Sequence, residues 1–356
     1  MRDPLETVAV TIGGGSFAGW EDVSITYAAD QAARTAKLTV SDFAGAVPFR
    51  PGEPCTITAS GTLILTGYVR TVTMQLDSSD HSVELEIVSR AVDAVEASVD
   101  HPTGFLRDKK LDDIAREFDS CGVGIECDES FPVEPRTYLQ TGQSLFDTLA
   151  PLARAHDALI YDTPAGHLRI AKKPRGRHAG RIAHGEGGNI ISGSATVSED
   201  QRFSPVLVRG QSTRGQTALA LRPEGRAIDD QVRRRRPLIQ ILESEATSGK
   251  LKTRAERHIK RAAGYSRQAN LTLVGWRDSG GRIWEQHFLV AVIAPRLSIE
   301  QDMAINSVTL SQSMDGGTTA SLALVDPRAL NGSGAGGKSA DVWATPAGAG
   351  SVGWGA

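Results

Sequence analysis

The first hundred residues alternate between apolar and polar positions. Apolar residues occupy every second position in six stretches, at 8–12, 23–27, 38–40, 55–58, 63–74 and 81–90. A period of two predicts strands with one buried and one solvated face, as in an antiparallel sheet or barrel. Turn-forming sequences separate the stretches, among them the glycines that begin at Gly13 and the run Arg50–Pro54.

Between about residues 103 and 175 the apolar spacing becomes helical. One amphipathic segment places four apolar residues on one face: Leu111, Ile114, Ala115 and Phe118. Asp108 is a suitable N-cap for this helix and Gly122 a suitable end. A second amphipathic segment, 143–156, contains Pro151, so we expect a kink or a break there.

A hairpin formed by Ala158–Asp162 and His167–Lys172 completes this small α/β module. After about residue 182 the period of two returns. Strands are expected at Ser204–Gly210, Thr217–Arg222, Arg236–Leu242, Ala269–Trp276, Arg282–Pro295, Ile305–Met314 and Thr319–Asp326. One helix, Ser248–Gly264, interrupts them.

The two strand-rich regions share an order of elements. In Val72–Val92 a strand, an Asp-Ser-Ser turn and a second strand follow one another, and Val308–Leu330 repeats this order around an Asp-Gly-Gly turn. Upstream, Phe49 and Trp284 each precede a polar bend, an apolar strand, a turn and another strand. We interpret this as a duplicated β-barrel with the α/β module between the copies. Chance similarity between two antiparallel segments is the alternative.

Composition narrows the class of protein. A chain of 356 residues with 40% hydrophobic residues is long enough for two to four domains. The formal net charge of −3 gives no overall basic field for nucleic acid. We find no signal peptide and no apolar run that could span a bilayer. The odd, sparse set of Cys55, Cys121 and Cys127 argues against a disulfide framework and for a reducing cytoplasm.

Motifs for chemistry are missing. The eight histidines are scattered, Cys121 and Cys127 have no nearby histidine, and no nucleophile elbow or phosphate loop occurs. We therefore predict no catalytic residue, no cofactor and no metal ligand. Two carboxylate pairs are adjacent enough to be weighed as hydrolase groups: Asp112 with Asp113, and Glu243 with Glu245. Neither pair has a partner constellation.

The densest charge cluster is the run Arg233–Arg236. Nucleic-acid binding is one interpretation, but no aromatic residue lies among the arginines and acidic residues surround them. The other interpretation is a loop whose arginines pair with an acidic neighbour, in this subunit or another.

The stretch Gly275–Pro295 could be a catalytic site or the wet face of a hairpin. It holds Arg277, Asp278, Glu285 and His287 near two tryptophans. We expect a turn at Ser279-Gly280-Gly281 followed by strands, with Trp276 and Trp284 flanking the turn. His287 is expected to be a structural or interface residue.

This second half resembles the C-terminal part of the baseplate hub proteins of Mu-type contractile-tailed phages, related to the late control protein D group. The resemblance rests on an ordered set of motifs: Arg236-Pro237, Glu243 or Glu245, Arg254-Ala255, Gly275-Trp276-Arg277, Gly280-Gly281 and Trp284. The 308–330 hairpin, the 138–173 module and the Pro48–Ile57 turn are also similar. The chain departs from the family at His287, where an asparagine is expected, and at Ala150-Pro151.

The resemblance implies a mainly β fold with an α+β insert. It implies two similar antiparallel β-barrel domains, 1–100 and 181–330, the second with one inserted helix. The small α/β module, 101–180, lies between them. The composition of residues 331–356 separately predicts a flexible Gly/Ala/Ser-rich tail, which has no counterpart in the family. In such hubs three subunits assemble into a pseudo-sixfold ring of barrels.

The implied function is structural rather than enzymatic. The chain would be a homotrimeric adaptor in the virion tail baseplate, assembled in the bacterial cytoplasm, that joins a sixfold tail tube to a threefold spike. Its partners would be the central spike protein, the tail tube or tube-initiator protein and other baseplate proteins, with no nucleic acid and no membrane span.

Two other functions remain open at this stage. One is a tail-tip cell-wall hydrolase using Glu243 and Glu245, and the other is a hub-like component of a type VI-like secretion spike. In the tail, Trp343 and Trp354 are unusual because the segment consists mainly of small residues. We expect them to anchor on another baseplate component. A tail without a partner is the alternative.

Overall fold

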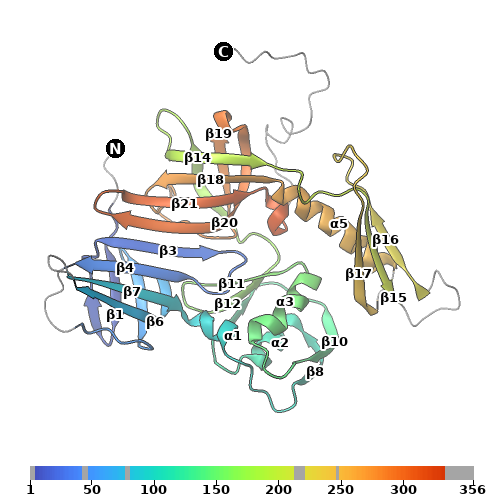
Figure 1. The fold of residues 1–356 in the computed structure, drawn as a ribbon, viewed down its shortest axis with the longest axis horizontal. Coiled ribbons are helices and arrows are strands. Elements are labelled where there is room, and N and C mark those ends of the chain that lie inside the picture. The colour runs from blue at the N-terminus through green and yellow to red at the C-terminus, as the bar shows by residue number, and fades with distance from the viewer. Residues whose placement is uncertain (1–4, 42–46, 77–80, 212–220, 246–247, 333–356) are drawn as a thin grey trace.

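The computed structural model describes residues 5–41, 47–76, 81–211, 221–245 and 248–332 (Figure 1). Strands dominate, as the alternation predicts, and thirteen of them belong to one extended sheet. The first region supplies β1 (Val8–Ile12), β2 (Gly15–Phe17), β3 (Asp22–Ala28), β4 (Thr35–Ser41), β5 (Pro54–Ala59), β6 (Thr62–Leu76) and β7 (His81–Ser89). The second supplies β13 (Arg177–Ala183), β14 (Ile190–Val197), β18 (Arg267–Val274), β19 (Leu289–Ala294), β20 (Ile299–Ser313) and β21 (Gly317–Val325).

The two strand-rich regions are joined edge to edge. Pairing runs in the order β14-β18-β21-β20-β3-β4-β7-β6-β5-β1-β2, and β19 lies between β20 and β13. Among the described strands this pairing closes into no ring, so the two separate barrels expected from the sequence are not seen. The physical reason is that the outer edge of β3 hydrogen-bonds to β20 instead of returning to its own half.

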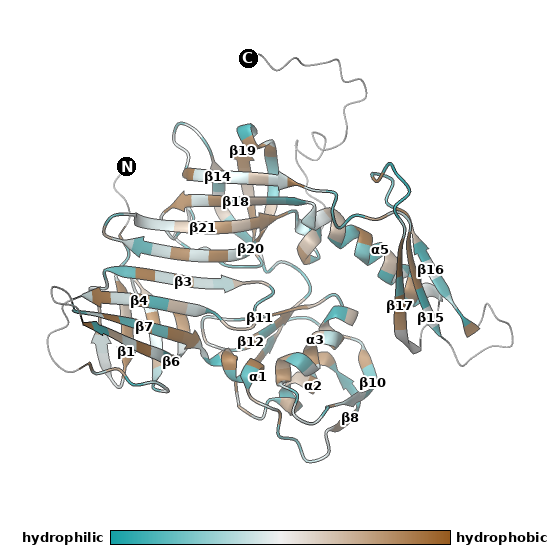
Figure 2. Cartoon of the chain, in the orientation of Figure 1, coloured by the Kyte–Doolittle hydropathy of each residue, from teal (hydrophilic) through white to brown (hydrophobic). Residues whose placement is uncertain are grey.

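Alternation in the sequence accounts for the core. In β3, Val23, Ile25 and Tyr27 are buried while the residues between them are partly exposed. The same banding of apolar and polar residues is visible along many strands in Figure 2. The buried apolar residues of both regions form one continuous cluster, which includes Leu38, Leu85, Leu271, Leu310 and Leu322. The two halves therefore share a core as well as a sheet.

The small α/β module has its own core. It contains α1 (Asp93–Glu96), β8 (Phe105–Lys110), α2 (Leu111–Phe118), β9 (Ile125–Cys127), β10 (Val133–Tyr138), α3 (Leu145–Ala155), β11 (Leu159–Asp162) and β12 (Leu168–Ala171). The four apolar residues predicted for the first helix are all buried in α2. Its start was predicted wrongly, because Asp108 lies in β8 with a φ of 49° and Lys110 is the N-cap residue. The second helix is not interrupted at Pro151, which lies inside α3.

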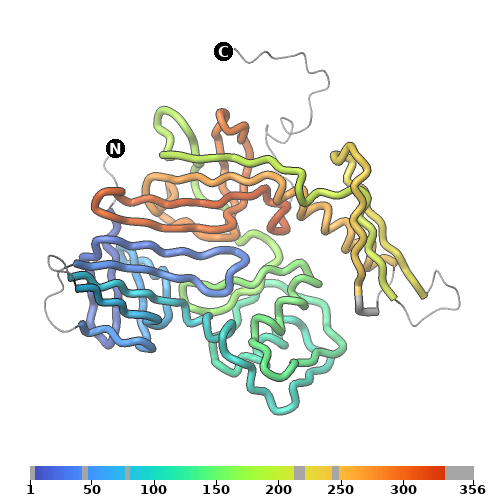
Figure 3. The backbone as a smooth tube through the Cα atoms, viewed as in Figure 1, coloured from blue at the N-terminus to red at the C-terminus, as the bar shows by residue number. Residues whose placement is uncertain are grey.

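The predicted hairpin is confirmed as β11 and β12, and it fixes the module to the sheet. At the end of β11, the buried Asp162 carboxylate accepts hydrogen bonds from the backbone N–H and the guanidinium of Arg34, at 3.0 and 2.9 Å. Leu159 and Tyr161 pack with Ala304, Val325 and other residues of the second half. The module therefore contacts both halves near their junction, as the chain trace in Figure 3 shows.

A lateral unit extends from the second half. It consists of β15 (Val206–Gln211), β16 (Glu224–Ala227), β17 (Leu238–Glu245) and the helix α5 (Ser248–Tyr265). Leu251 and Ala255 of α5 pack on Val206 and Val208 of β15. The sequence predicted β15, β17 and this helix, but not β16 and not the separate three-stranded sheet that the strands form. Most of the expected strand Thr217–Arg222 lies outside the described residues.

Of the helices in the described part of the chain, none has the length and apolar character needed to cross a membrane.

Candidate assembly surfaces

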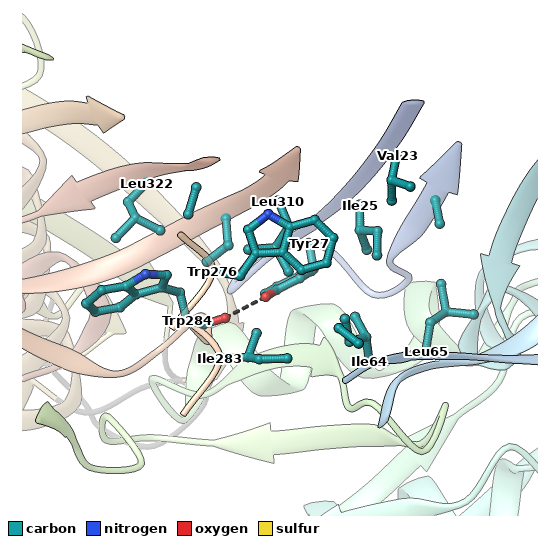
Figure 4. Close-up of a cluster of buried hydrophobic side chains, with 14 of the residues drawn as sticks. Val23, Ile25, Tyr27, Ile64, Leu65, Trp276, Ile283, Trp284, Leu310 and Leu322 are labelled. Carbon is teal, nitrogen blue, oxygen red and sulfur yellow. Dashed lines mark hydrogen bonds between the residues drawn. The ribbon is translucent and has the colours of Figure 1, made fainter. Parts of the chain in front are cut away.

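The stretch from Gly275 to Pro295 forms a closed turn and not an open site. Arg277 and Ile283 make an isolated antiparallel bridge, and the backbone N–H of Trp284 donates to the backbone carbonyl of Trp276 at 3.0 Å. Both indole rings are buried, with exposed fractions of 0% for Trp276 and 1% for Trp284. Figure 4 shows them beside Tyr27, whose hydroxyl donates to the Trp284 carbonyl. The expected turn is confirmed, and its tryptophans belong to the shared core.

Arg277 connects this turn to the first half of the molecule. Its guanidinium donates to both oxygens of Glu6, at 2.6 and 3.0 Å, and to the Ala59 carbonyl at 2.9 Å. Burial alone would raise the pKa of Glu6, but the hydrogen bonds from Arg277 and Ser60 outweigh it and hold that pKa below its usual value. The pair is a structural clasp between segments at opposite ends of the sequence.

Asp278 holds a buried histidine that the sequence did not single out. His178 Nδ1 lies 2.8 Å from the Asp278 carboxylate, and its Nε2 accepts the Glu285 N–H at 3.1 Å. Burial is the main cause that lowers the pKa of His178, so the ring is neutral with its proton on Nδ1. Both side chains are almost fully inaccessible, at 0% and 2% exposure. An Asp–His pair closed to solvent orients a turn and cannot exchange protons with a substrate.

His287 is fully buried where the module meets the second half. Its Nδ1 accepts from the Tyr161 hydroxyl at 3.2 Å and its Nε2 donates to the Leu330 carbonyl at 3.3 Å. Its φ of 60° is in the left-handed region. Burial lowers the pKa of the ring to about 4. His287 is therefore a neutral structural residue that joins three segments.

The other candidate groups are dispersed. Asp112 and Asp113 both pair with Arg116 on the surface of α2. Glu243 and Glu245 fall within β17, but their side chains lie outside the described residues. No cluster of three or more potential metal-ligating side chains occurs in the part of the chain that the structure describes.

The cysteines add no site. Cys55 is buried, Cys121 is exposed and Cys127 is half-buried, and all three are free thiols. Trp343 and Trp354 lie outside the described residues.

Part of the arginine run makes contacts within the chain. Arg236 donates to the carbonyls of Glu199, Asp200 and Arg202 and lies over the Phe203 ring at 4.6 Å. Arg234 pairs with the Glu199 carboxylate at 3.0 Å. The Arg234–Glu199 pair favours the interpretation in which the arginines pair with an acidic neighbour, whereas Arg236 binds backbone carbonyls.

The junction of the two halves is a regular antiparallel ladder. Seven residue pairs join β3 to the second part of β20, from Ala28 opposite Ser307 to Asp22 opposite Ser313. On the core face, Ile25 and Leu310 are opposite each other and both are completely buried. On the other face the hydroxyls of Thr26 and Thr309 lie 3.2 Å apart.

That second face is polar and uncharged over much of the second half. A shallow depression spans β14, β18, β20 and β21, and no charged side chain lines it. Its polar lining residues are Ser192, Ser194, Asn270, Thr272, Ser307, Thr309 and Ser321. Hydroxyl and amide groups form hydrogen bonds with water or with another polypeptide chain, and they do not strongly favour a partner of either charge.

The strand edges of the large sheet that have no partner strand in the described chain include those of β14 and of the later part of β6, as well as those of β2 and β13. β14 pairs only with β18. β6 pairs with β5 through Tyr68 and with β7 along its later part, which leaves the far edge of residues 71–76 without a strand beside it. Apolar side chains near the edges of β14 and β6 are exposed: 60% for Met74, 85% for Leu76 and 54% for Val197. Exposed edges and exposed apolar side chains are typical of surfaces that bind another chain.

Comparison with known proteins finds relatives of this chain. Two family models match, the N-terminal domain of the Mu phage baseplate assembly protein GpP-like over residues 7–87 and the fourth domain of the Mu phage baseplate assembly protein GpP over residues 247–332. The baseplate hub protein gp44 of Escherichia phage Mu is 24% identical over 324 residues, which cover 85% of this chain and 83% of gp44.

Solved structures agree over nearly the whole length. The 43 kDa tail protein of prophage MuSo2 from Shewanella oneidensis is 25% identical with a TM-score of 0.82, and the match covers 92% of this chain and 99% of that one. The tail protein of Neisseria meningitidis MC58 shares the fold at 17% identity and a TM-score of 0.78, with coverage of 92% and 99%. Over nearly its whole length the chain is therefore similar to the baseplate hub and tail proteins of Mu-type phages.

Proposed function

We propose that this protein is a structural hub of a contractile phage tail baseplate. It acts as a homotrimeric adaptor between the sixfold tail tube and the threefold central spike. The observation that carries the proposal is the internal duplication: β5, β6 and β7 contain 6, 15 and 9 residues, and β19, β20 and β21 contain the same numbers. Three chains with two similar halves each present six similar surfaces, and the trimer itself has only threefold symmetry.

In this proposal the two halves complete a barrel-like ring only when neighbouring chains meet. The division into 1–100, 101–180, 181–330 and a 331–356 tail is part of it, with the first and third segments forming the ring. The central spike, the tube or its initiator and other baseplate proteins are the partners. Assembly precedes incorporation into the virion and takes place in the host cytoplasm.

The protein has no catalytic role in this scheme. Support comes from the buried state of the Asp278–His178 pair and from the pairing of Asp112 and Asp113 with Arg116. The similar proteins are baseplate and tail proteins, which is consistent with a structural role.

The test is the mass and shape of the purified protein. Light scattering is expected to give three times the chain mass of 37.9 kDa. Negative-stain images are expected to show a threefold ring with a pseudo-sixfold lumen. A protein that stays monomeric at high concentration and shows no ring contradicts the proposal.

A further inference from the structure

The duplication can be followed residue by residue through the strand pairing. β6 and β20 each carry a bulge at which one residue is skipped, Arg70 in β6 and Asn306 in β20. Both bulges are followed two residues later by Val-Thr, at Val72-Thr73 and at Val308-Thr309. Because bulges fix local register, these positions correspond.

The strands that follow agree with this correspondence. Ser89, the last residue of β7, accepts a hydrogen bond from the N–H two residues on, at the start of the 3-10 turn η1 (Arg90–Val92). Asp326, after β21, does the same at the start of η3 (Pro327–Leu330). Both side chains are completely buried.

The correspondence continues outward across the sheet. β4 reads Ala-Lys-Leu-Thr-Val from Ala36, and β18 reads Ala-Asn-Leu-Thr-Leu from Ala269. β3 pairs with β4 as β14 pairs with β18, antiparallel in both cases. This places Ser24 and Thr26 of β3 in the positions of Ser194 and Thr196 of β14. β14 is therefore the counterpart of β3.

The two counterparts differ in what lies beside them. β3 is paired along the outer edge of β20, whereas β14 has no strand on its outer side. β6, the counterpart of β20, likewise lacks a strand along residues 71–76. The pairing order separates β14 from β6 by six strands, and the two edges are not paired with each other within the described chain.

We propose that β14 of one copy pairs antiparallel with residues 71–76 of β6 in the next copy. The interface repeats the register that β3 and β20 adopt within the chain. Transferring that register sets Thr73 opposite Thr196, Val72 opposite Val197 and Met74 opposite Ala195. The Thr73–Thr196 pair is the counterpart of the hydroxyl pair Thr26–Thr309.

The burial of side chains supports this register. Leu310 and Val308 are fully buried where β3 covers β20, but Met74, which corresponds to Leu310, is 60% exposed. Val197, which corresponds to the buried Tyr27, is 54% exposed. Pairing would remove both from water. Neither edge carries a charge in 71–76 or in 190–197, although charges are a common device that prevents unwanted pairing of edge strands.

The interface is heterologous, because each copy contributes one edge of each kind. Such contacts form rings or filaments and not closed twofold dimers. This inference rests on the proposed function, which sets the ring at three chains, and it assigns the residues that join them.

Cysteine cross-linking tests the register. In a background with Cys121→Ser and Cys127→Ser, a Thr73→Cys chain is mixed with a Thr196→Cys chain and oxidised. Directly opposed residues in antiparallel strands lie at about 4.5–5.5 Å between Cα atoms, within disulfide range. We expect a disulfide-linked heterodimer from the mixture and a covalent ring of three from the chain that carries both cysteines. Thr73→Cys with Val197→Cys, one residue out of register, is the matched control and is expected to link poorly.

The possible outcomes test the proposed strand register separately from the proposed trimer. A light-scattering trimer in which Thr73→Cys and Thr196→Cys do not link, or link no better than the control pair, overturns the strand pairing and leaves the proposed function standing. A disulfide homodimer of the Thr196→Cys chain alone also overturns it, because it shows a twofold contact. A monomer overturns both.

A substitution at the edge gives a second test that needs no cysteine. Met74→Lys is expected to weaken self-association at least tenfold, as measured by sedimentation, while thermal unfolding of the chain changes little. Met314→Lys is the control, because Met314 is 87% exposed at the β20–β21 turn and lies on neither edge. Equal association by both variants contradicts the proposal.

Discussion

At the scale of single residues, the polar groups that suggested chemistry form buried structural contacts. Arg277, Asp278 and His287 each bind groups far away in the sequence, respectively Glu6, His178 and Tyr161. The sequence identified the charged cluster but not its partners, since tertiary contacts of this kind have no local pattern. The burial of His287 in particular follows only from the meeting of three segments.

The buried histidines predict acid lability. The pKa of His287 falls from 6.5 in the unfolded chain to about 4 in the folded one, so its contribution to stability is complete above pH 6.5 and is lost as the pH falls toward 4. The loss amounts to ~3 kcal/mol of unfolding free energy from this residue. Urea unfolding at pH 7.5, 6, 5 and 4 measures it.

The variant His287→Asn is the control for this pH dependence. Asparagine tolerates a left-handed backbone and does not titrate, so the variant keeps the local conformation. Its stability is expected to fall less steeply below pH 6.5, with the remaining slope due in part to His178, whose pKa is also lowered by burial. An unchanged slope would show that His287 is not the responsible group.

Loss of the Arg277 clasp predicts a measurable destabilisation. Arg277→Met leaves the Glu6 carboxylate, only 5% exposed, without its cation, at a cost of about 2–4 kcal/mol in unfolding free energy. Arg209→Met removes a pair with Glu224 in which both side chains are about half exposed, and is expected to cost less than about 1 kcal/mol. Chemical denaturation compares the two; equal costs would contradict the structural role of the clasp.

At the scale of elements, local pattern predicted most strands and helices. Period-two alternation located β3, β6, β7 and β20, because one face of each strand lies on the core. The start of α2 was missed, since Asp108 lies inside β8, between Arg107 and Lys109, which pair with β10, and not at a helix cap. Pro151 is accommodated within α3, where its side chain is exposed.

The docking of α5 depends on one glycine. A Cβ on Gly264 would lie 2.1 Å from the backbone nitrogen of Ala329 in η3, so Gly264→Ala must push the helix and the turn apart. We expect a loss of about 1–3 kcal/mol in unfolding free energy. Gly249→Ala, in the exposed first turn of the same helix, is expected to be neutral or to stabilise by up to about 1 kcal/mol. Thermal unfolding distinguishes them, and equal effects would contradict the close packing.

At the scale of the whole molecule, the duplication was visible in the sequence, but the way in which the two halves join into one sheet was not. The echo between Val72–Val92 and Val308–Leu330 corresponds to matching strand pairs and matching caps. Which edge pairs with which is decided by contacts between residues hundreds of positions apart, such as Thr26 with Thr309. Hydrophobic alternation specifies which face is buried and says nothing about which strand lies alongside.

The neutral edges predict that self-association depends little on salt. Apolar burial and backbone hydrogen bonds would drive the pairing of β6 with β14, and no charge lies in 71–76 or 190–197. The dissociation constant is expected to change by less than about threefold between roughly 0.05 and 0.5 M NaCl. Sedimentation across this range tests it, and a steep weakening with salt would indicate that other, charged contacts hold the copies together.

The β3–β20 junction has a consequence for how a ring comes apart. One polypeptide carries both strands, so each strand meets its partner at a high effective concentration. Pairing at this seam, the line along which β3 and β20 join, therefore does not depend on the protein concentration. Seams between chains lack a tether and follow mass action. Dilution of a three-chain ring therefore opens every second seam only, and the pieces released are always joined pairs of halves, never single halves.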